Sequence, residues 1–402
     1  MILYTVMKAP LHQVFNSGVD RLVRPVFRGF RRSWSAFKVC GYTGLVLAYV
    51  LAMTLVVRLG LSPWVMVGLG LSSMATFLTL AMITKIIVGE ERLIYYHHEI
   101  AIMVVAALVL WLFNQPILPY LDLTLMGVGL FLACGRVGCL MVGCCHGRPH
   151  RWGVCYRTDH AEAGFAPYYV GVRFFPIQAA ESLVVFGLVT VGTWLIWHGY
   201  PPGEALAWYV ITYDVERFLF EFARGDSTRP YFAGFSEAQW TSLLLMILVV
   251  WAEVAGILTF HPWHAVATAL VVLVMIGVAI ARRLRNIPKH RLLHPHHIKE
   301  VAVVIDRVAG LSTEATTRSE PPRKPGAVYL GQTSLGIQIS AGTHRQAGRP
   351  VVHYTLSRQR GDLPETWARA LAMLILRLRH PAASNQLTPG THPGVFHMLV
   401  FV

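Results

Sequence analysis

The chain has 402 residues, of which 54% are hydrophobic and only 14% are charged. Soluble domains carry about 25% charged residues, so this composition excludes an ordinary soluble protein and predicts an integral membrane protein. The formal net charge of +14 lies mainly beside the apolar segments, and we expect a membrane partner and no nucleic-acid partner.

The first 40 residues (1–40) are rich in arginine and are predicted to form a basic amphipathic segment along the membrane interface. Pro25 is expected to kink any continuous helix there. No cleavable signal peptide is expected, so the first apolar span would direct insertion. The apolar positions that recur at helical spacing are Val19, Leu22, Val26 and Phe30.

Residues 41–285 contain eight apolar stretches that are candidates to cross a hydrocarbon core of about 30 Å. Each is predicted to be helical, because a strand or loop facing lipid would leave backbone groups without partners. The predicted fold is an all-α polytopic membrane domain with about seven to eight transmembrane helices. The stretches are Tyr42–Val57, Leu61–Ile83, Ile100–Tyr120, Leu123–Leu140, Ile177–Trp197, Ala205–Phe222, Trp240–Phe260 and Ala265–Ala281.

The composition becomes soluble after the last stretch. Residues 286–325 are predicted to form a basic and polar linker, and residues 326–402 a small α+β soluble module. This C-terminal module has no catalytic signal, and an accessory or docking role is expected. Its predicted strands are Tyr329–Ser340, Val351–Ser357 and Val395–Val402, and its predicted helix is Leu363–Arg379.

Segment 134–149 places an arginine, glycines and thiols at the end of an apolar helix. An arginine on a membrane helix costs about 2.5–3.5 kcal/mol on insertion, so Arg136 is expected to serve an anionic partner such as a lipid phosphate. The nearby Gly135, Gly138 and Gly147 would let helices and lipid approach closely.

Four of the six cysteines, beginning with Cys139, fall within one short interval. With His146 they suggest a metal site, but their spacing is not that of two separated CxxC knuckles, and we predict no metal. A disulfide between Cys155 and either Cys144 or Cys145 is an alternative if this face is extracytoplasmic. Close packing of small side chains at a helix end is the third interpretation.

A polar stripe is predicted on the sixth apolar stretch. Tyr213, Arg217, Glu221 and Arg224 recur at steps of four, four and three residues, so a helix would present them on one face. Because lipid cannot face such a stripe, it indicates either a structural ion pair or a lined cavity.

Two smaller polar groups stand at predicted helix starts. Gln178 and Glu181 share one face of the helix that follows Pro176, and a buried glutamate there is expected to pair with an arginine. His97 and His98 precede the third stretch, and histidine can accept a proton near neutral pH. Part of an interfacial aromatic belt is the alternative interpretation of the two histidines.

Three motifs are notable for their order and spacing: Gly135-Arg136-Val137-Gly138-Cys139, Pro176-Ile177-Gln178 with Glu181, and Arg217–Arg224. Together they resemble the prolipoprotein diacylglyceryl transferase family over roughly Val39–Phe260. That family consists of multi-span bacterial inner-membrane enzymes that move the diacylglyceryl group of phosphatidylglycerol to the lipobox cysteine of a lipoprotein precursor and release glycerol phosphate. The resemblance implies the same reaction or a closely related lipid-dependent transfer, in the bacterial inner membrane and without a cofactor. The implied partners are phosphatidylglycerol or another anionic phospholipid, and a lipobox-containing precursor.

The resemblance also implies roles for individual residues. Arg136 and Arg217 would clamp the departing phosphate, with Glu221 orienting the arginines, and His97 or His98 would remove the thiol proton. The residues expected to bind substrate are Gly135, Gly138, Cys139, Cys144, Gly147, Gln178, Glu181, Tyr213 and Arg224.

Several positions depart from the family pattern. The family's asparagine after GRxG is Cys139, and its glutamate five residues later is Cys144. The two glycines expected after the histidine are missing. These departures leave two other interpretations: a non-enzymatic membrane protein that binds anionic lipid, and a thiol-based redox or metal membrane protein.

Two arguments predict opposite orientations in the membrane. Basic residues flank both ends of the apolar region, and the positive-inside tendency would place these ends and the basic loops in the cytoplasm. The family resemblance places the reactive loops on the extracytoplasmic side. We favour the second orientation, because arginines that bind phosphate are not only topological signals.

Overall fold

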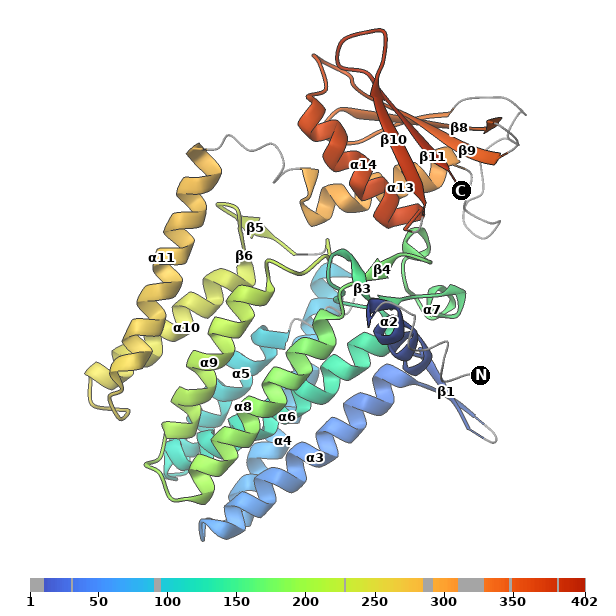
Figure 1. The fold of residues 1–402 in the computed structure, drawn as a ribbon. Coiled ribbons are helices and arrows are strands. Elements are labelled where there is room, and N and C mark those ends of the chain that lie inside the picture. The colour runs from blue at the N-terminus through green and yellow to red at the C-terminus, as the bar shows by residue number, and fades with distance from the viewer. Residues whose placement is uncertain are drawn as a thin grey trace.

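The computed structural model describes residues 11–29, 32–89, 95–227, 229–284, 292–309, 329–346, 349–381 and 383–401. Long helices form a bundle, and a β-rich module lies beyond one end of it (Figure 1). Phe30, residues 286–291 and 310–325 of the predicted linker, and residues 326–328 and 402 of the predicted module lie outside the described residues.

All eight predicted apolar stretches overlap helices, namely α3 (Ala36–Arg58), α4 (Pro63–Val88), α5 (Tyr95–Leu112), α6 (Ile117–Val142), α8 (Ile177–Trp197), α9 (Glu204–Phe220), α10 (Glu237–Val254) and α11 (Pro262–Leu284). Six of these helices are long and apolar enough to cross a membrane; α5 is a shorter apolar helix, and α9 is not among the six. The chain is therefore a multi-pass membrane protein with a mostly helical fold, as predicted.

One predicted span is interrupted. The stretch Ile100–Tyr120 is divided between α5 and α6 by a turn in which Asn114 has a φ of 50° and Pro116 precedes the first residue of α6. Asparagine tolerates this left-handed conformation, and a proline just before a helix removes no internal hydrogen bond. A hydropathy pattern alone does not register such a turn.

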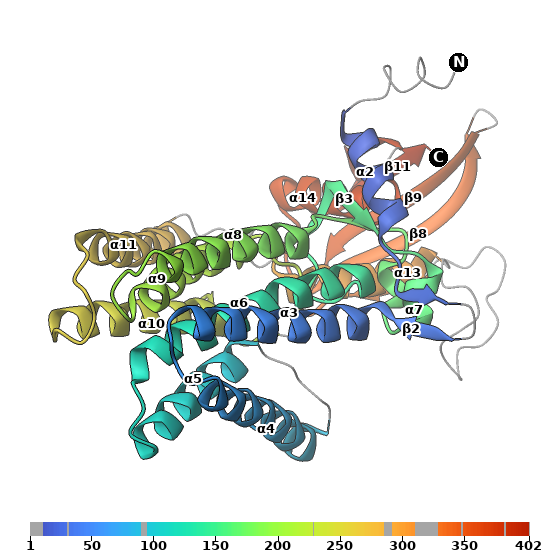
Figure 2. The same cartoon turned by 90° about the horizontal axis from the view of Figure 1, so that it is seen from below.

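The bundle has an apolar interior and an apolar exterior. Leu69, Leu110 and Leu123 are fully buried between helices, whereas Ile86 and Leu183 are each about three-quarters exposed. Exposed apolar side chains on this scale fit a lipid-facing surface. In Figure 2, α4 lies at the edge of the bundle, apart from the closely packed pair α3 and α6.

The start of α9 is capped from another helix. Both carboxylate oxygens of the buried Asp122 accept backbone N–H bonds, from Gly203 at 2.7 Å and from Leu206 at 2.8 Å. These N–H groups would otherwise have no partner at the first turn of a helix.

A layer of short elements covers the end of the bundle nearest the module (Figure 1). The helix near the N-terminus stops before Pro25, and Val26 pairs in a strand with Ser35, so the predicted helical continuation to Val26 is wrong. The elements are α2 (Leu11–Leu22), β1 (Val26–Arg28), β2 (Ser33–Ser35), β3 (Pro149–Cys155), α7 (Thr158–Glu162), η1 (Pro167–Tyr169), β4 (Arg173–Phe174), β5 (Tyr231–Phe232) and β6 (Phe235–Ser236).

Helix α2 packs on β3 through polar contacts. Asn16 donates to the carbonyl of Arg151 at 2.9 Å and accepts from the backbone N–H of Gly153 at 2.8 Å. Asp20 accepts from the backbone N–H of Cys155 and pairs with Arg173 at 2.8 Å. These bonds attach the basic N-terminal segment to the loop layer.

The C-terminal module is an antiparallel five-stranded sheet, in the order β10-β11-β9-β8-β7, with two helices packed on it. Alternate residues of β8, including Ile337 and Ile339, face α13 and α14 in one apolar core. The elements are α13 (Pro295–Ala309), β7 (Tyr329–Gln332), β8 (Ile337–Gln346), β9 (Arg349–Arg358), α14 (Glu365–Arg379), β10 (Ser384–Pro389) and β11 (Phe396–Phe401).

Two features of this sheet differ from the prediction. The predicted strand Tyr329–Ser340 is two strands joined by a turn, in which the backbone N–H of Gly336 bonds to the carbonyl of Thr333 at 2.9 Å. Strand β10 escaped prediction because its sequence is mostly polar and lacks an apolar alternation.

The module docks on the loop layer of the bundle. Its apolar core continues into Val154, Tyr156 and Phe174 of the loop layer as one cluster of buried residues. Arg379 reinforces this contact, pairing with Asp306 at 2.7 Å and donating to the carbonyl of Tyr168 at 3.0 Å.

Candidate active site

Two loops meet at the end of the bundle that the module covers. The backbone N–H of Arg148 bonds to the carbonyl of Ala223, and that of Gly225 to the carbonyl of His146, each at 3.0 Å. A side chain on Gly147 would begin 2.4 Å from the carbonyl oxygen of Phe175, so glycine is required there. The loop after α6 thereby lies beside the turn after α9, as the predicted role of Gly147 in close approach requires.

Glu181 is the centre of the polar cluster that these loops enclose. Its side chain is fully buried, and its Oε1 contacts Arg136 Nη2 at 2.7 Å and Arg217 Nη1 at 3.2 Å. Its Oε2 contacts Arg224 Nη1 at 3.4 Å. The expected pairing of Glu181 with an arginine is therefore present, but with three arginines from two segments of the chain.

A second layer of charges surrounds this centre. Oε1 of Glu221 contacts Arg217 at 3.0 Å and Arg229 at 2.6 Å. Asp226 contacts Arg224 at 3.0 Å and Arg229 at 3.2 Å. Four guanidinium groups thus face three carboxylates, Glu181, Glu221 and Asp226, and we call these seven residues the arginine cluster.

The arginine cluster has an excess of positive charge. Burial acts to raise the pKa of Asp226, but Arg224 and Arg229 hold that pKa below its usual range, so this carboxylate is ionised. The cluster thus has four guanidinium groups against three carboxylates. Hydrogen bonds with Cys139 and Cys144, and the charges of Arg224 and Arg136, hold the pKa of the adjacent Cys145 thiol well below its usual range, so this thiol can offset part of the excess.

Two arginines of the cluster present hydrogen-bond donors without a protein partner. The Nε of Arg136 and the Nη2 of Arg224 are buried and form no hydrogen bond with the described residues. Leaving a buried charged donor unsatisfied costs more than the roughly 1–3 kcal/mol of a neutral one. The arrangement therefore suits an anionic group that accepts from both arginines, such as a phosphate.

The predicted polar stripe is not one continuous helical face. Helix α9 ends at Phe220, and Arg224 lies in the turn that follows rather than on the helix. Tyr213 is buried one turn before Arg217 and stacks on Tyr209 at 5.4 Å between ring centres. The turn, not the helical period, brings Arg224 back to Glu181.

Three thiols lie at the edge of the arginine cluster. The Sγ atoms of Cys139, Cys144 and Cys145 lie within 4.8 Å of one another, which is a spacing that could hold a soft metal ion. All six cysteines are free, so the alternative of a disulfide to Cys155 is wrong for this structure. Gln178 steadies the thiol loop by donating to the carbonyl of Cys144 at 2.8 Å.

The two predicted histidines differ in environment. The half-exposed His97 contacts Glu237 Oε1 through its Nε2 at 3.0 Å, and the neighbouring Tyr96 is within electrostatic range of Arg217 and Arg229. His98 is buried against the ring of Phe77, at 4.8 Å between ring centres. Of the two, His97 is the more accessible.

The predicted glycines Gly138 and Gly135 differ in how closely other residues approach them. A side chain on Gly138 would meet Phe37 and Cys40 of α3 at 3.2–3.3 Å, so Gly138 lets α3 and α6 pack closely. Nothing in the described chain lies within 4 Å of such a side chain at Gly135. Close helix packing therefore does not explain Gly135, and its predicted role in close approach of lipid stays a prediction.

Asp226, Arg229 and Glu237 were absent from the predicted set. Arg229 is the second partner of both Glu221 and Asp226, and Glu237 is the partner of His97. Arg229 is in an irregular loop without a periodic signal. Glu237 stands in the first turn of α10 after the N-cap Ser236, where an acidic residue has an ordinary structural explanation.

The fold and the arginine cluster together define a class: polytopic membrane proteins with a buried, arginine-rich site at one end of the helical bundle. A family model for prolipoprotein diacylglyceryl transferase matches residues 36–255, which are 220 of the 402 residues. The chain therefore belongs to the prolipoprotein diacylglyceryl transferase family.

Several curated relatives match about a third of the chain. They include the phosphatidylglycerol–prolipoprotein diacylglyceryl transferase 2 of Clostridium perfringens, 32% identical over 136 residues, which are 33% of this chain and 49% of the relative. The corresponding transferase of Clostridium tetani is 32% identical over 135 residues, 34% of this chain and 52% of the relative. The transferase of Dehalococcoides mccartyi is 35% identical over 132 residues, which are 32% of this chain and 48% of the relative. The chain thus spans about half the length of these relatives.

Proposed function

We propose that this protein transfers the diacylglyceryl group of phosphatidylglycerol to a cysteine thiol of a lipoprotein precursor in the bacterial inner membrane. The observation that carries the proposal is the set of three buried arginines around Glu181, in which Arg136 and Arg224 retain free donors. The family membership and the names of the relatives support the same substrates.

The proposed reaction exchanges one bond to the glyceryl carbon of the lipid for another. The thiol sulfur attacks the carbon that carries the phosphoester, a C–S bond forms, and the C–O bond breaks with its electron pair leaving on glycerol phosphate. Arg136 and Arg217 stabilise the charge that develops on the phosphate oxygens. The thiol proton passes to His97, which Glu237 orients at 3.0 Å.

The proposal assigns the reaction to residues 41–285. The basic segment 1–40 precedes this transferase region. The docking module comprises the predicted residues 326–402 together with α13 (Pro295–Ala309), a helix that lies inside the stretch 286–325 predicted as a linker and packs on β7 and β8. No step of this reaction requires a metal or an organic cofactor. The lipid partner and the precursor both reach the arginine cluster from the membrane.

A turnover assay tests the proposal. The purified full chain is given phosphatidylglycerol labelled in both glycerol moieties and a lipobox peptide, and the peptide and released glycerol phosphate are followed by mass spectrometry. We expect a diacylglyceryl adduct on the peptide, and loss of at least about 100-fold in rate for Arg136→Gln or Arg217→Gln. The exposed Arg151 gives the matched control, Arg151→Gln, with unchanged rate.

Two outcomes would contradict the proposal. If both arginine variants keep the wild-type rate while folded, the phosphate clamp is wrong. If the wild type binds phosphatidylglycerol but forms neither product, the protein is a lipid-binding member of the family that does not catalyse this transfer.

A further inference from the structure

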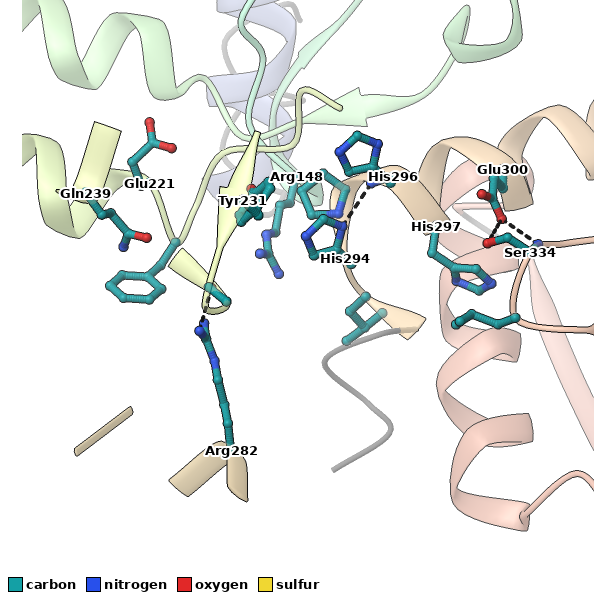
Figure 3. Close-up of a pocket in the computed structure, with 15 residues that line it drawn as sticks. Arg148, Glu221, Tyr231, Gln239, Arg282, His294, His296, His297, Glu300 and Ser334 are labelled. Atoms are coloured by element: carbon teal, nitrogen blue, oxygen red, sulfur yellow. Dashed lines mark hydrogen bonds between the residues drawn. The ribbon is translucent and has the colours of Figure 1, made fainter. Parts of the chain in front are cut away.

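A cavity of about 800 Å³ lies between the bundle and the C-terminal part of the chain (Figure 3). Arg148, Tyr231 and Arg282 line it from the bundle side, and His294 and His296 line it from the start of α13. Small-molecule sites typically measure roughly 300–1,000 Å³. The two histidines and Arg282 lie outside the family match of residues 36–255, so the family region alone does not form this site.

The two arginines of the cavity are not neutralised by carboxylates. Arg148 donates through Nε to the carbonyl of Arg224 at 3.3 Å, and Arg282 donates through Nη1 to the carbonyl of Gly234 at 2.5 Å. Neither arginine forms an ion pair with a residue of the described ranges. Carbonyl oxygens orient the guanidinium groups without cancelling their charge.

Two carboxylates stand in the cavity wall, and each has at least one oxygen engaged, while Oε2 of Glu221 is buried without a hydrogen-bond partner among the described residues. Glu300 accepts from both the backbone N–H and the hydroxyl of Ser334, each at 2.8 Å, as the dashed lines in Figure 3 show. Oε1 of Glu221 faces Arg217 and Arg229 of the arginine cluster. Neither carboxylate forms an ion pair with Arg148 or Arg282.

The histidines add to this basic lining. The rings of His294 and His296 stack at 5.2 Å, and the ring of Tyr231 meets that of His294 edge-on at 4.5 Å. Burial, together with the neighbouring His296, Arg148 and Arg282, lowers the pKa of His294 to about 4, so this ring is neutral near pH 7. Burial and the charge of Arg282 also lower the pKa of Arg148, because two guanidinium groups share one cavity, a situation that a bound anion relieves.

We propose that this cavity binds a phosphomonoester anion, with Arg148 and Arg282 as the charged donors and His294 and His296 as adjustable donors. Guanidinium groups match phosphate oxygens in geometry, and the first turn of α13, which begins at Pro295, adds the positive end of a helix. Two arginines suit the double charge of a phosphomonoester better than the single charge of a carboxylate.

The occupant follows from the proposed function, on which this step of the inference rests. Glu221 belongs both to the arginine cluster and to the cavity wall, so the two sites are adjacent. Glycerol phosphate released at the arginine cluster would enter the cavity, which then serves as the product site. The same phosphate chemistry is offered by the headgroup of an intact anionic phospholipid.

Calorimetric titration of the full chain in detergent tests the anion site, with inorganic phosphate and glycerol 1-phosphate as the two probes. We expect saturable binding of both, weakened at least tenfold by Arg282→Gln. Arg283 is the next residue of α11 and is exposed, so Arg283→Gln is the matched control with unchanged binding. If Arg282→Gln is unfolded, His294→Asn provides the same comparison.

Two results would overturn the anion site: no saturable binding by the wild type, or wild-type affinity in both folded variants. Repeating the titration in phosphatidylglycerol and phosphatidylcholine nanodiscs identifies the source of the phosphate. Loss of binding only with phosphatidylglycerol assigns the cavity to the lipid headgroup, and equal binding in both assigns it to free product. Arg282-dependent binding without any peptide modification would refute the proposed function and leave the anion site standing.

Discussion

Glu181 is the shared carboxylate of three arginines, so its substitution is expected to lower both stability and turnover. In Glu181→Gln, the buried guanidinium groups of Arg136, Arg217 and Arg224 lose their shared carboxylate. Breaking one buried ion pair is worth roughly 3–5 kcal/mol, so we expect a clear drop in melting temperature and a turnover at least about 100-fold lower. Both quantities are measured on the purified chain.

The control for this prediction is Glu365→Gln. Glu365 also pairs with an arginine, Arg369, but on the exposed surface of α14. Exposed pairs contribute about 0–1 kcal/mol, so this variant should match the wild type. A Glu181→Gln protein with wild-type stability and turnover would show that the arginines do not depend on this carboxylate.

The thiols provide a second prediction at the residue scale. In the proposed reaction the attacking thiol belongs to the precursor, so Cys139, Cys144 and Cys145 take no covalent part. The triple substitution to serine should therefore keep turnover within about tenfold of the wild type, and a metal chelator should not change it. Turnover that falls with the thiols and survives Arg136→Gln would instead support a thiol-based redox or metal protein.

Helix packing governs the prediction at the scale of elements. Gly44 of α3 lies against α6, where an added methyl group would meet the Cβ of Cys134 at 2.7 Å. Overpacking of this kind typically costs about 1–3 kcal/mol, so Gly44→Ala should lower the melting temperature by several degrees. Gly41 lies one turn earlier on the same helix with nothing within 4 Å, and Gly41→Ala should be neutral or slightly stabilising. Equal melting temperatures would contradict this packing argument.

Elements with a strong apolar pattern could be predicted, and those defined by tertiary contacts could not. The positions of α3, α6 and α8 follow from composition, since a single long apolar segment satisfies its own backbone in lipid only as a helix. The mostly polar β10 is fixed by its pairing with β11, which no local pattern reports. Strand β10 is for that reason visible only in the folded module.

The same distinction holds for the site. Arg136, Glu181 and Arg217 were predictable because charge on apolar helices is rare enough to carry information. Arg229 was not, because an arginine in a polar loop is ordinary until the fold brings it to Glu221. The cavity beside the module likewise could not be predicted from the sequence, because its walls come from segments more than 100 residues apart.

At the scale of the whole molecule, two histidines where α13 begins link the stability of the fold to pH. His294 is partly buried and His297 is buried, and burial lowers the pKa of each below the usual value of about 6.5. Their protonation is therefore easier in the unfolded chain than in the folded one. The contribution of the two neutral histidines to the free energy of unfolding is complete above about pH 6.5. It is lost as the pH falls toward the pKa of His294 in the folded chain, about 4.

This linkage gives a prediction for the intact protein. The wild-type melting temperature should fall between pH 7.5 and pH 5, and the fall should be smaller in His294→Asn, which cannot take up the proton. His392→Asn, at an exposed position of the module, should retain the wild-type dependence. An identical fall in His294→Asn and wild type would remove His294 from the acid response. Since a bound anion would favour the protonated ring, phosphate should reduce the wild-type loss at pH 5 and leave His294→Asn less affected.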